Sequence, residues 1–131
     1  MPAPIVVRDA TRGTVVAGRV TPGLSFWQRF MGLMGRPSLE PDEGLYLPTS
    51  SIHMLFMRFP IDALFLSAPD THGVRRVAAV RPRLRPWSGL VMPVKGAQGV
   101  VELPAGTLDR SGLQPGDAVV FDALMEPAAA T

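Results

Sequence analysis

The chain has 131 residues, of which 47% are hydrophobic and 18% are charged, which is enough for one domain with a substantial core. It contains no cysteine, so disulfides and thiolate metal sites are excluded, and its net charge of +2 is low for a nucleic-acid binder. The 13 glycines and 14 prolines favour many short segments joined by turns over long helices. We therefore expect a single domain over residues 1–131, with a core at about 5–125 and a frayed tail at 126–131.

The N-terminus lacks both a basic start and an apolar run of the length that a signal peptide needs. Nowhere do about twenty apolar residues follow one another, which is the length that a membrane-spanning helix requires. The sequence thus predicts a cytoplasmic protein with no membrane partner.

The strand signals are short β-prone runs bounded by glycine, proline or aspartate. Taken in chain order, they predict strands near residues 5–7, 14–20, 45–47, 51–57, 61–67, 74–80, 97–103 and 117–122. The first two flank Arg12-Gly13 and suit a hairpin. Residues 88–96 have no clear period and suggest a long loop, whereas residues 107–111 look helical and end at Gly112.

The strongest helix signal lies at residues 25–35. Ser25 is a suitable cap, and Gln28 three residues later completes a capping box. A single apolar stripe follows at helical spacing, made by Trp27, Phe30, Met31 and Met34. The overall expectation is a mainly β (α+β) protein, a small curved β-sandwich or open barrel with this one short amphipathic helix near the N-terminus.

Residues 51–67 hold the densest group of large apolar side chains, in two runs that meet at Arg58-Phe59-Pro60. Pro60 cannot donate to a sheet ladder, so the chain is expected to bend there and to carry Asp62 inward. A buried carboxylate suggests a general base or a metal ligand. The alternative is a structural carboxylate that accepts backbone N–H groups from the bend or pairs with Arg58.

Three further residues carry chemistry. His53, alone in an apolar strand, suits a hydrogen-bonded core residue better than a ligand. Together with Met57 it hints at a soft-metal site, but Met54 points to the opposite side of the strand, so we predict no metal and no cofactor. Glu102, between two apolar residues, faces either a pocket or solvent.

A basic stretch runs from Arg75 to Lys95 without a single acid. Within it Arg81, Arg83 and Arg85 alternate with apolar residues, so they are expected to share one side of an extended segment that ends at Trp87. Arginines beside a tryptophan suit nucleic-acid binding, with the ring stacked on a base. A tryptophan lid over the end of a barrel, with the arginines in water, is the simpler interpretation.

Several segments in order resemble one known family, the domain of unknown function 192. They are residues 32–36, 42–45, 51–62, 85–87, 101–106 and 116–117, and the likeness runs from about residue 8 to about residue 124. The resemblance implies a small mostly-β fold carrying a short helix. This bacterial and archaeal family is uncharacterised, so the resemblance brings no activity, substrate or cofactor.

The hypothesis that fits these residues best is a non-catalytic binding module for a small anionic ligand or a protein partner. Its expected binding residues are Met57, Arg58, Asp62, Trp87, Glu102, His53 and Arg36. A hydrolase with Asp62 or Glu102 as base and His53 as acid or ligand is the first alternative. A nucleic-acid binder that uses the Arg75–Lys95 stretch is the second.

Overall fold

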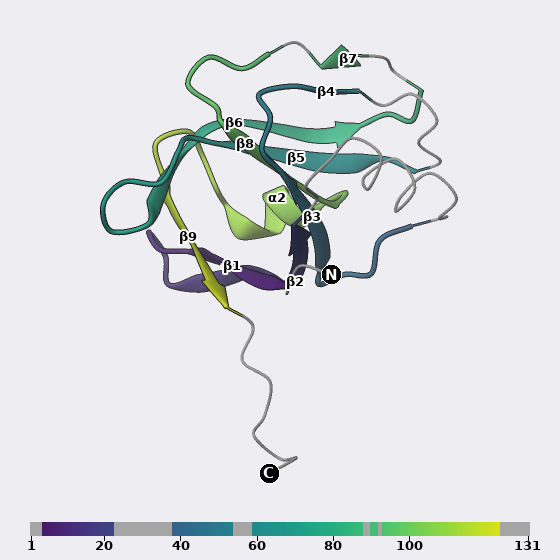
Figure 1. Cartoon of the computed structure of the whole chain (residues 1–131). Coiled ribbons are helices and arrows are strands. Elements are labelled where there is room, and N and C mark those ends of the chain that lie inside the picture. Colours follow the sequence, from purple (N-terminus) through teal and green to yellow (C-terminus); the bar gives the residue numbers. More distant parts are fainter. Residues whose placement is uncertain (1–3, 23–37, 54–58, 88–89, 92, 124–131) are drawn as a thin grey trace, which may run out of the picture.

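The structure is a computed structural model, and it describes residues 4–22, 38–53, 59–87, 90–91 and 93–123. Within these ranges the chain is mainly β, with one short helix (Figure 1). The strands are β1 (Ile5–Asp9), β2 (Thr14–Pro22), β3 (Glu43–Leu47), β4 (Ile52–His53), β5 (Ile61–Leu66), β6 (Val74–Leu84), β7 (Leu90–Val91), β8 (Gly99–Pro104) and β9 (Ala118–Ala123). The helix is α2 (Thr107–Ser111).

Seven of these strands close into a barrel in the order β1-β2-β3-β8-β5-β6-β9, and β4 and β7 form a separate two-stranded sheet. Neighbouring strands are antiparallel except for β2 and β3, which run parallel. In Figure 1 the β4–β7 sheet lies outside the barrel wall near β5 and β6. The helix α2 contacts β2, β5 and β6. The prediction of a mainly β fold is confirmed, and the barrel is closed rather than open.

All of β5 is buried, because the core has two layers and each layer covers one face of this strand. Alternate residues of β5 contribute to different clusters, as expected where both faces of a strand are covered. One cluster fills the barrel interior, where Leu64 and Leu66 pack with α2 through Leu108. The other lies between the barrel wall and the β4–β7 sheet, and includes Phe65 and Ile52.

Most predicted elements appear where the sequence places them. The strands near both ends of the chain, the β1–β2 hairpin and the short helix at residues 107–111 are all observed. The predicted loop at residues 88–96 is partly wrong, because Leu90–Val91 pair with Ile52–His53. The amphipathic helix predicted at residues 25–35 lies outside the described residues, as does most of the strand predicted at 51–57.

A bulge interrupts β6 opposite Asp62. The β5–β6 register shifts at this point, and Arg83 within the shift has a φ of 51°, which is uncommon for a residue other than glycine. Arg81 pairs with Ala63 on the outer face of the wall, whereas the Arg83 side chain reaches Asp109 in α2. The expectation that the alternating arginines share one side is therefore wrong at Arg83.

Candidate functional site

Asp62 is fully buried and saturated with hydrogen bonds from the backbone. Its Oδ1 accepts the N–H of Arg83 at 2.8 Å, and its Oδ2 accepts the N–H groups of Gly106 at 3.1 Å and Leu108 at 2.8 Å. These donors belong to the β6 bulge and to the start of α2, so the carboxylate holds two distant segments against β5. The sequence suggested backbone donors at the bend beside Pro60, whereas these three donors lie on β6 and at the start of α2.

Glu102, the second predicted acid, is also fully buried but lies on the other face of the sheet. In the antiparallel register Glu102 is opposite Ala63, whereas Asp62 is opposite Leu103. Directly opposed residues share a face, so Glu102 points into the outer core layer and Asp62 into the barrel. The two carboxylates do not converge on one site, and Glu102 does not face solvent.

The other residues expected around Asp62 are only partly described. Arg36, Met57 and Arg58 lie outside the described residues. His53 is placed only by its backbone, which pairs with Leu90 in the β4–β7 sheet. Trp87 is 59% exposed, and its φ of 64° is uncommon for a tryptophan. The predicted grouping of these residues around Asp62 therefore stays a prediction.

Two arginines of the basic stretch have partners within the described fold. The Arg75 guanidinium lies 4.4 Å from the ring centre of Phe121 and 5.3 Å from that of Tyr46, and it donates to the Tyr46 hydroxyl at 3.2 Å. Arg83 forms an ion pair with Asp109. At least two cations of the stretch are therefore used within the fold, which weakens the case for a nucleic-acid interface.

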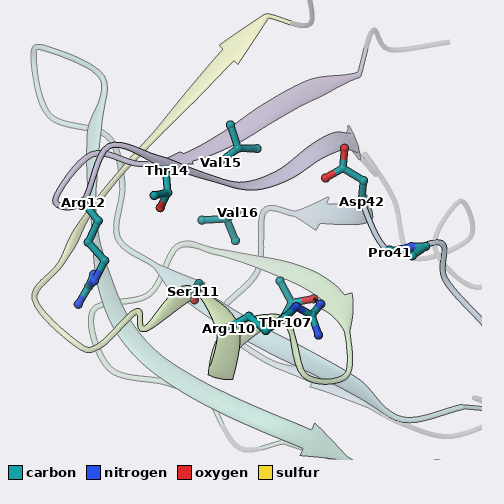
Figure 2. A pocket seen from close by; sticks show the side chains of 9 residues that line it. All are labelled: Arg12, Thr14, Val15, Val16, Pro41, Asp42, Thr107, Arg110 and Ser111. Carbon is teal, nitrogen blue, oxygen red and sulfur yellow. Dashed lines mark hydrogen bonds between the residues drawn. The ribbon is translucent and has the colours of Figure 1, made fainter.

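A groove of about 500 Å³ lies between β2 and α2 (Figure 2). Three segments that are distant in the sequence line it. They contribute Arg12, Thr14, Val15 and Val16 from the β1–β2 hairpin, Pro41 and Asp42 from the turn before β3, and Thr107, Arg110 and Ser111 from α2. This volume falls within the range of small-molecule sites, and hydroxyl, guanidinium and carboxylate groups border it.

The helix wall of the groove is set by glycines and by local hydrogen bonds. Gly106 and Gly112 flank α2 with φ angles of 97° and 72°, a left-handed conformation that glycine adopts readily. The Thr107 hydroxyl donates to the Pro104 carbonyl at 2.7 Å, and Arg110 Nη2 lies 3.4 Å from Thr107 Oγ1. No acidic side chain among the described residues forms an ion pair with Arg110.

Arg12, the other cation of the groove, is already neutralised. Its Nη1 donates to Asp117 Oδ2 at 2.7 Å and to the buried Asp9 Oδ2 at 3.0 Å. The hydrogen bond from Arg12, followed by one from the backbone N–H of Gln114, holds the pKa of Asp117 below its usual value. The hydrogen bonds to Asp117 and Asp9 correspondingly raise the pKa of Arg12. This cluster ties the β1–β2 turn to the start of β9.

Asp42 stands where β3 joins β2. Its Oδ1 accepts the N–H of Gly18 at 2.8 Å, and its main-chain carbonyl accepts the N–H of Arg19 at 3.0 Å. A Cβ at position 18 would collide with the Asp42 carboxylate, so glycine is required there for this contact. In the described residues Asp42 forms no ion pair. The groove thus carries an acid and a base that do not neutralise each other.

Sequence reasoning did not find this groove. Residues 107–111 were predicted as helix and Asp42 fell within a predicted turn, but neither prediction indicated that the two segments face β2. In the described ranges no three histidine or acidic side chains are grouped so as to hold a metal ion. Within the same ranges no helix has the length and apolar character needed to cross a membrane.

The closed seven-stranded barrel and its short helix place this chain among small β-barrel proteins. The model of the domain of unknown function 192, described as an uncharacterized ACR, matches residues 8–121, and the chain belongs to this family. The family resemblance inferred from the motifs is confirmed.

Relatives and solved structures agree with this assignment. A UPF0127 protein of Thermococcus sibiricus is 35% identical over 119 residues, covering 87% of this chain and 73% of that protein. A UPF0127 protein of Pyrococcus furiosus is 30% identical over 121 residues, covering 89% of this chain and 98% of that protein.

Two solved structures superpose with TM-scores of 0.70. One is a Novosphingobium aromaticivorans protein of unknown function, 25% identical, with 88% of this chain and 82% of that chain covered. The other, from Sinorhizobium meliloti 1021 and titled a "putative transcription regulator", is 23% identical, with 92% and 97% covered. At this identity the second likeness shows the fold alone.

Proposed function

We propose that this protein is a non-catalytic binding module whose groove between β2 and α2 receives an anionic group. That group belongs to a small molecule or to an acidic segment of a protein partner. The observation that carries the proposal is Arg110, a guanidinium at the wall of a concave site with no acidic partner in the described residues. Guanidinium groups bind carboxylates and phosphates through paired N–H donors.

The surroundings of Arg110 favour an anion at this position. The hydroxyls of Thr107 and Ser111 border the same wall, and Thr14 lies on the opposite strand. The hydroxyls of Thr107 and Ser111 already donate to the carbonyls of Pro104 and Leu108, so these two side chains shape the wall of the groove. The Thr14 hydroxyl, which forms no such bond among the described residues, can donate to a phosphate or a carboxylate. Arg12 contributes less, because two carboxylates already balance its charge.

Binding is a better account than catalysis because the predicted base is occupied. All three hydrogen bonds to Asp62 come from the backbone and anchor α2 and the β6 bulge, so this carboxylate has a structural task. A general base must reach the proton that it removes. Glu102 lies on the opposite face of the sheet and does not share a substrate atom with Asp62.

The experiment is a thermal-unfolding titration with two probes, succinate and inorganic phosphate, at constant ionic strength. A ligand that binds only the folded state raises the melting temperature with its concentration. We expect at least one probe to stabilise the natural chain and to have no effect on Arg110→Gln. Constant ionic strength is needed because salt screens exposed charges.

The matched control is Arg81→Gln, since Arg81 is an exposed arginine outside the groove whose Nη1 contacts only the Val80 carbonyl in the described structure. This variant should respond to the probes as the natural chain does. An equal response of the natural chain and Arg110→Gln to both probes would remove the proposed anion site.

A further inference from the structure

One edge of β2 lacks a neighbouring strand over its first residues. β1 pairs with β2 from Thr14 onward, but β3 joins the opposite edge only at Arg19. Within the described residues no strand pairs with Thr14 to Ala17 on that edge, and Thr14, Val15 and Val16 line the groove there, as Figure 2 shows. A strand edge of this kind presents backbone N–H and C=O groups that another extended chain can pair with.

The side chains on this edge suit a strand-like occupant. The β1–β2 register shifts at this point, and the two adjacent valines differ in environment: Val16 is 7% exposed and Val15 is 50% exposed. An exposed β-branched side chain in an incompletely paired strand offers an apolar contact to a residue of an added strand. The groove therefore combines a backbone edge with an apolar contact.

The charges of the groove select among extended segments. Arg110 lies on the helix wall, and Asp42 lies just before the point where β3 begins to pair with β2. Neither forms an ion pair in the described residues. An occupant with an acidic side chain toward Arg110 and a basic side chain toward Asp42 would satisfy both, and a simple anion would satisfy only one.

We infer that the groove binds an extended segment of a partner protein, added as a strand to the Thr14–Ala17 edge of β2 and carrying one acid and one base. This inference rests on the proposed function, because the acid of the segment is the anionic group received by Arg110. Backbone pairing supplies affinity, and the two charges supply selectivity.

The test uses the full chain and a displayed library of random heptapeptides. Selection on the natural chain should enrich peptides that contain both an acid and a base. Asp42→Asn, which keeps the acceptor for Gly18, should no longer select the base. Absence of any enriched peptide would overturn strand addition.

One enriched peptide is then synthesised in two forms, each N-methylated on alternate residues. Since alternate N–H groups of a strand point to opposite edges, one form should bind roughly tenfold or more weakly than the unmodified peptide, and the other should bind nearly as well. Amide hydrogen exchange at residues 14–17 should slow on binding. Equal affinity of both forms, or unchanged exchange, would overturn the inference.

The outcomes separate this inference from the proposed function. Succinate or phosphate binding that depends on Arg110, without peptide binding, leaves the anion site and removes strand addition. Peptide binding that is equal for the natural chain and Arg110→Gln, yet sensitive to N-methylation, keeps strand addition and removes the anion site. No binding of any probe removes both.

Discussion

The two sides of α2 differ in whether their polar and charged groups have partners within the described fold. Toward the barrel, the helix packs Leu108 into the interior, and its first N–H groups are bound by the buried Asp62. Toward the groove, the same helix presents Arg110 and Ser111 beside a strand edge. The charge on the barrel side is bound by backbone donors, whereas the Arg110 charge on the groove side has no acidic partner among the described residues.

This difference shows why burial alone is a poor guide to function. Asp62 has the burial expected of a catalytic acid, yet the three partners that it has among the described residues are backbone donors that hold the architecture together. Buried carboxylates need such partners because an isolated charge is costly away from water. Arg110, which no sequence pattern singled out, is the better candidate because the described fold gives it no acidic partner.

Asp62→Asn should cause the largest loss of stability. The amide retains one acceptor oxygen but replaces the other with a donor that faces backbone N–H groups, so at least one charge-assisted hydrogen bond is lost and one N–H becomes unsatisfied. We expect the free energy of unfolding to fall by about 3 kcal/mol in a urea titration.

The control for this substitution is Asp122→Asn, which removes the acid of an ion pair with Arg8 whose side chains are 50% and 41% exposed. Exposed ion pairs contribute about 0–1 kcal/mol, so this variant should stay close to the natural chain. Comparable losses in the two variants would contradict the structural role assigned to Asp62.

Gly44→Ala should rank second. A Cβ at position 44 would lie 2.9 Å from the Glu102 carbonyl oxygen and 3.2 Å from side-chain carbons of Val20 and Leu103. Because one of these neighbours is backbone within a closed barrel, relief requires strands to shift, and we expect a loss of about 2 kcal/mol by urea titration.

Gly18→Ala makes the same change in the adjacent strand, where the added methyl group meets only the Asp42 carboxylate. A side chain can rotate away at the loss of its hydrogen bond to Gly18, so the expected loss is about 1 kcal/mol. A greater loss from Gly18→Ala than from Gly44→Ala would show that the edge of β2 is less adaptable than its neighbour.

The sequence predicted elements well and their assembly poorly. Glycine and proline mark where strands stop, and Gly112 marked the end of α2 because a left-handed residue follows many helices. The burial of Asp62 was also predictable from its apolar neighbours. Its donors lie 21, 44 and 46 residues along the chain, so only the closed barrel identifies them.

The groove was beyond prediction for the same reason. It arises because β3 meets β2 late, at Arg19, and because α2 returns to the edge left open. Strand register and the point at which two strands meet depend on the whole barrel rather than on any local pattern. The residues that line the groove are ordinary turn, strand and helix residues when each segment is considered alone.

The Asp9–Arg12–Asp117 cluster, which lies beside the groove, predicts a dependence of stability on pH. The Arg12 hydrogen bond lowers the pKa of folded Asp117 below its ordinary value of 3.8. A lowered folded-state pKa contributes stability above the unfolded-state pKa, and that contribution is lost as the pH falls through the folded-state value. Asp117→Asn should therefore lower the urea midpoint at pH 7, and the gap from the natural chain should shrink as the pH falls below 3.8 and through the lower folded-state pKa.

The measurement is a series of urea titrations from pH 7 to pH 2. Asp122→Asn is a suitable companion, because it removes an acid from an exposed pair outside the cluster. A gap between Asp117→Asn and the natural chain that stays constant down to pH 2 would mean that ionisation of Asp117 adds nothing to the folded state.

Arg110→Gln should have the smallest effect on stability, and this is what makes it informative. Among the described residues the Arg110 side chain takes part in one hydrogen bond, the 3.4 Å contact to Thr107, which is at the long end of the range. The free energy of unfolding should therefore change by less than about 0.5 kcal/mol. A loss as large as that of Asp62→Asn would show that Arg110 stabilises the fold. The groove side of α2 would then have the same structural role as its barrel side.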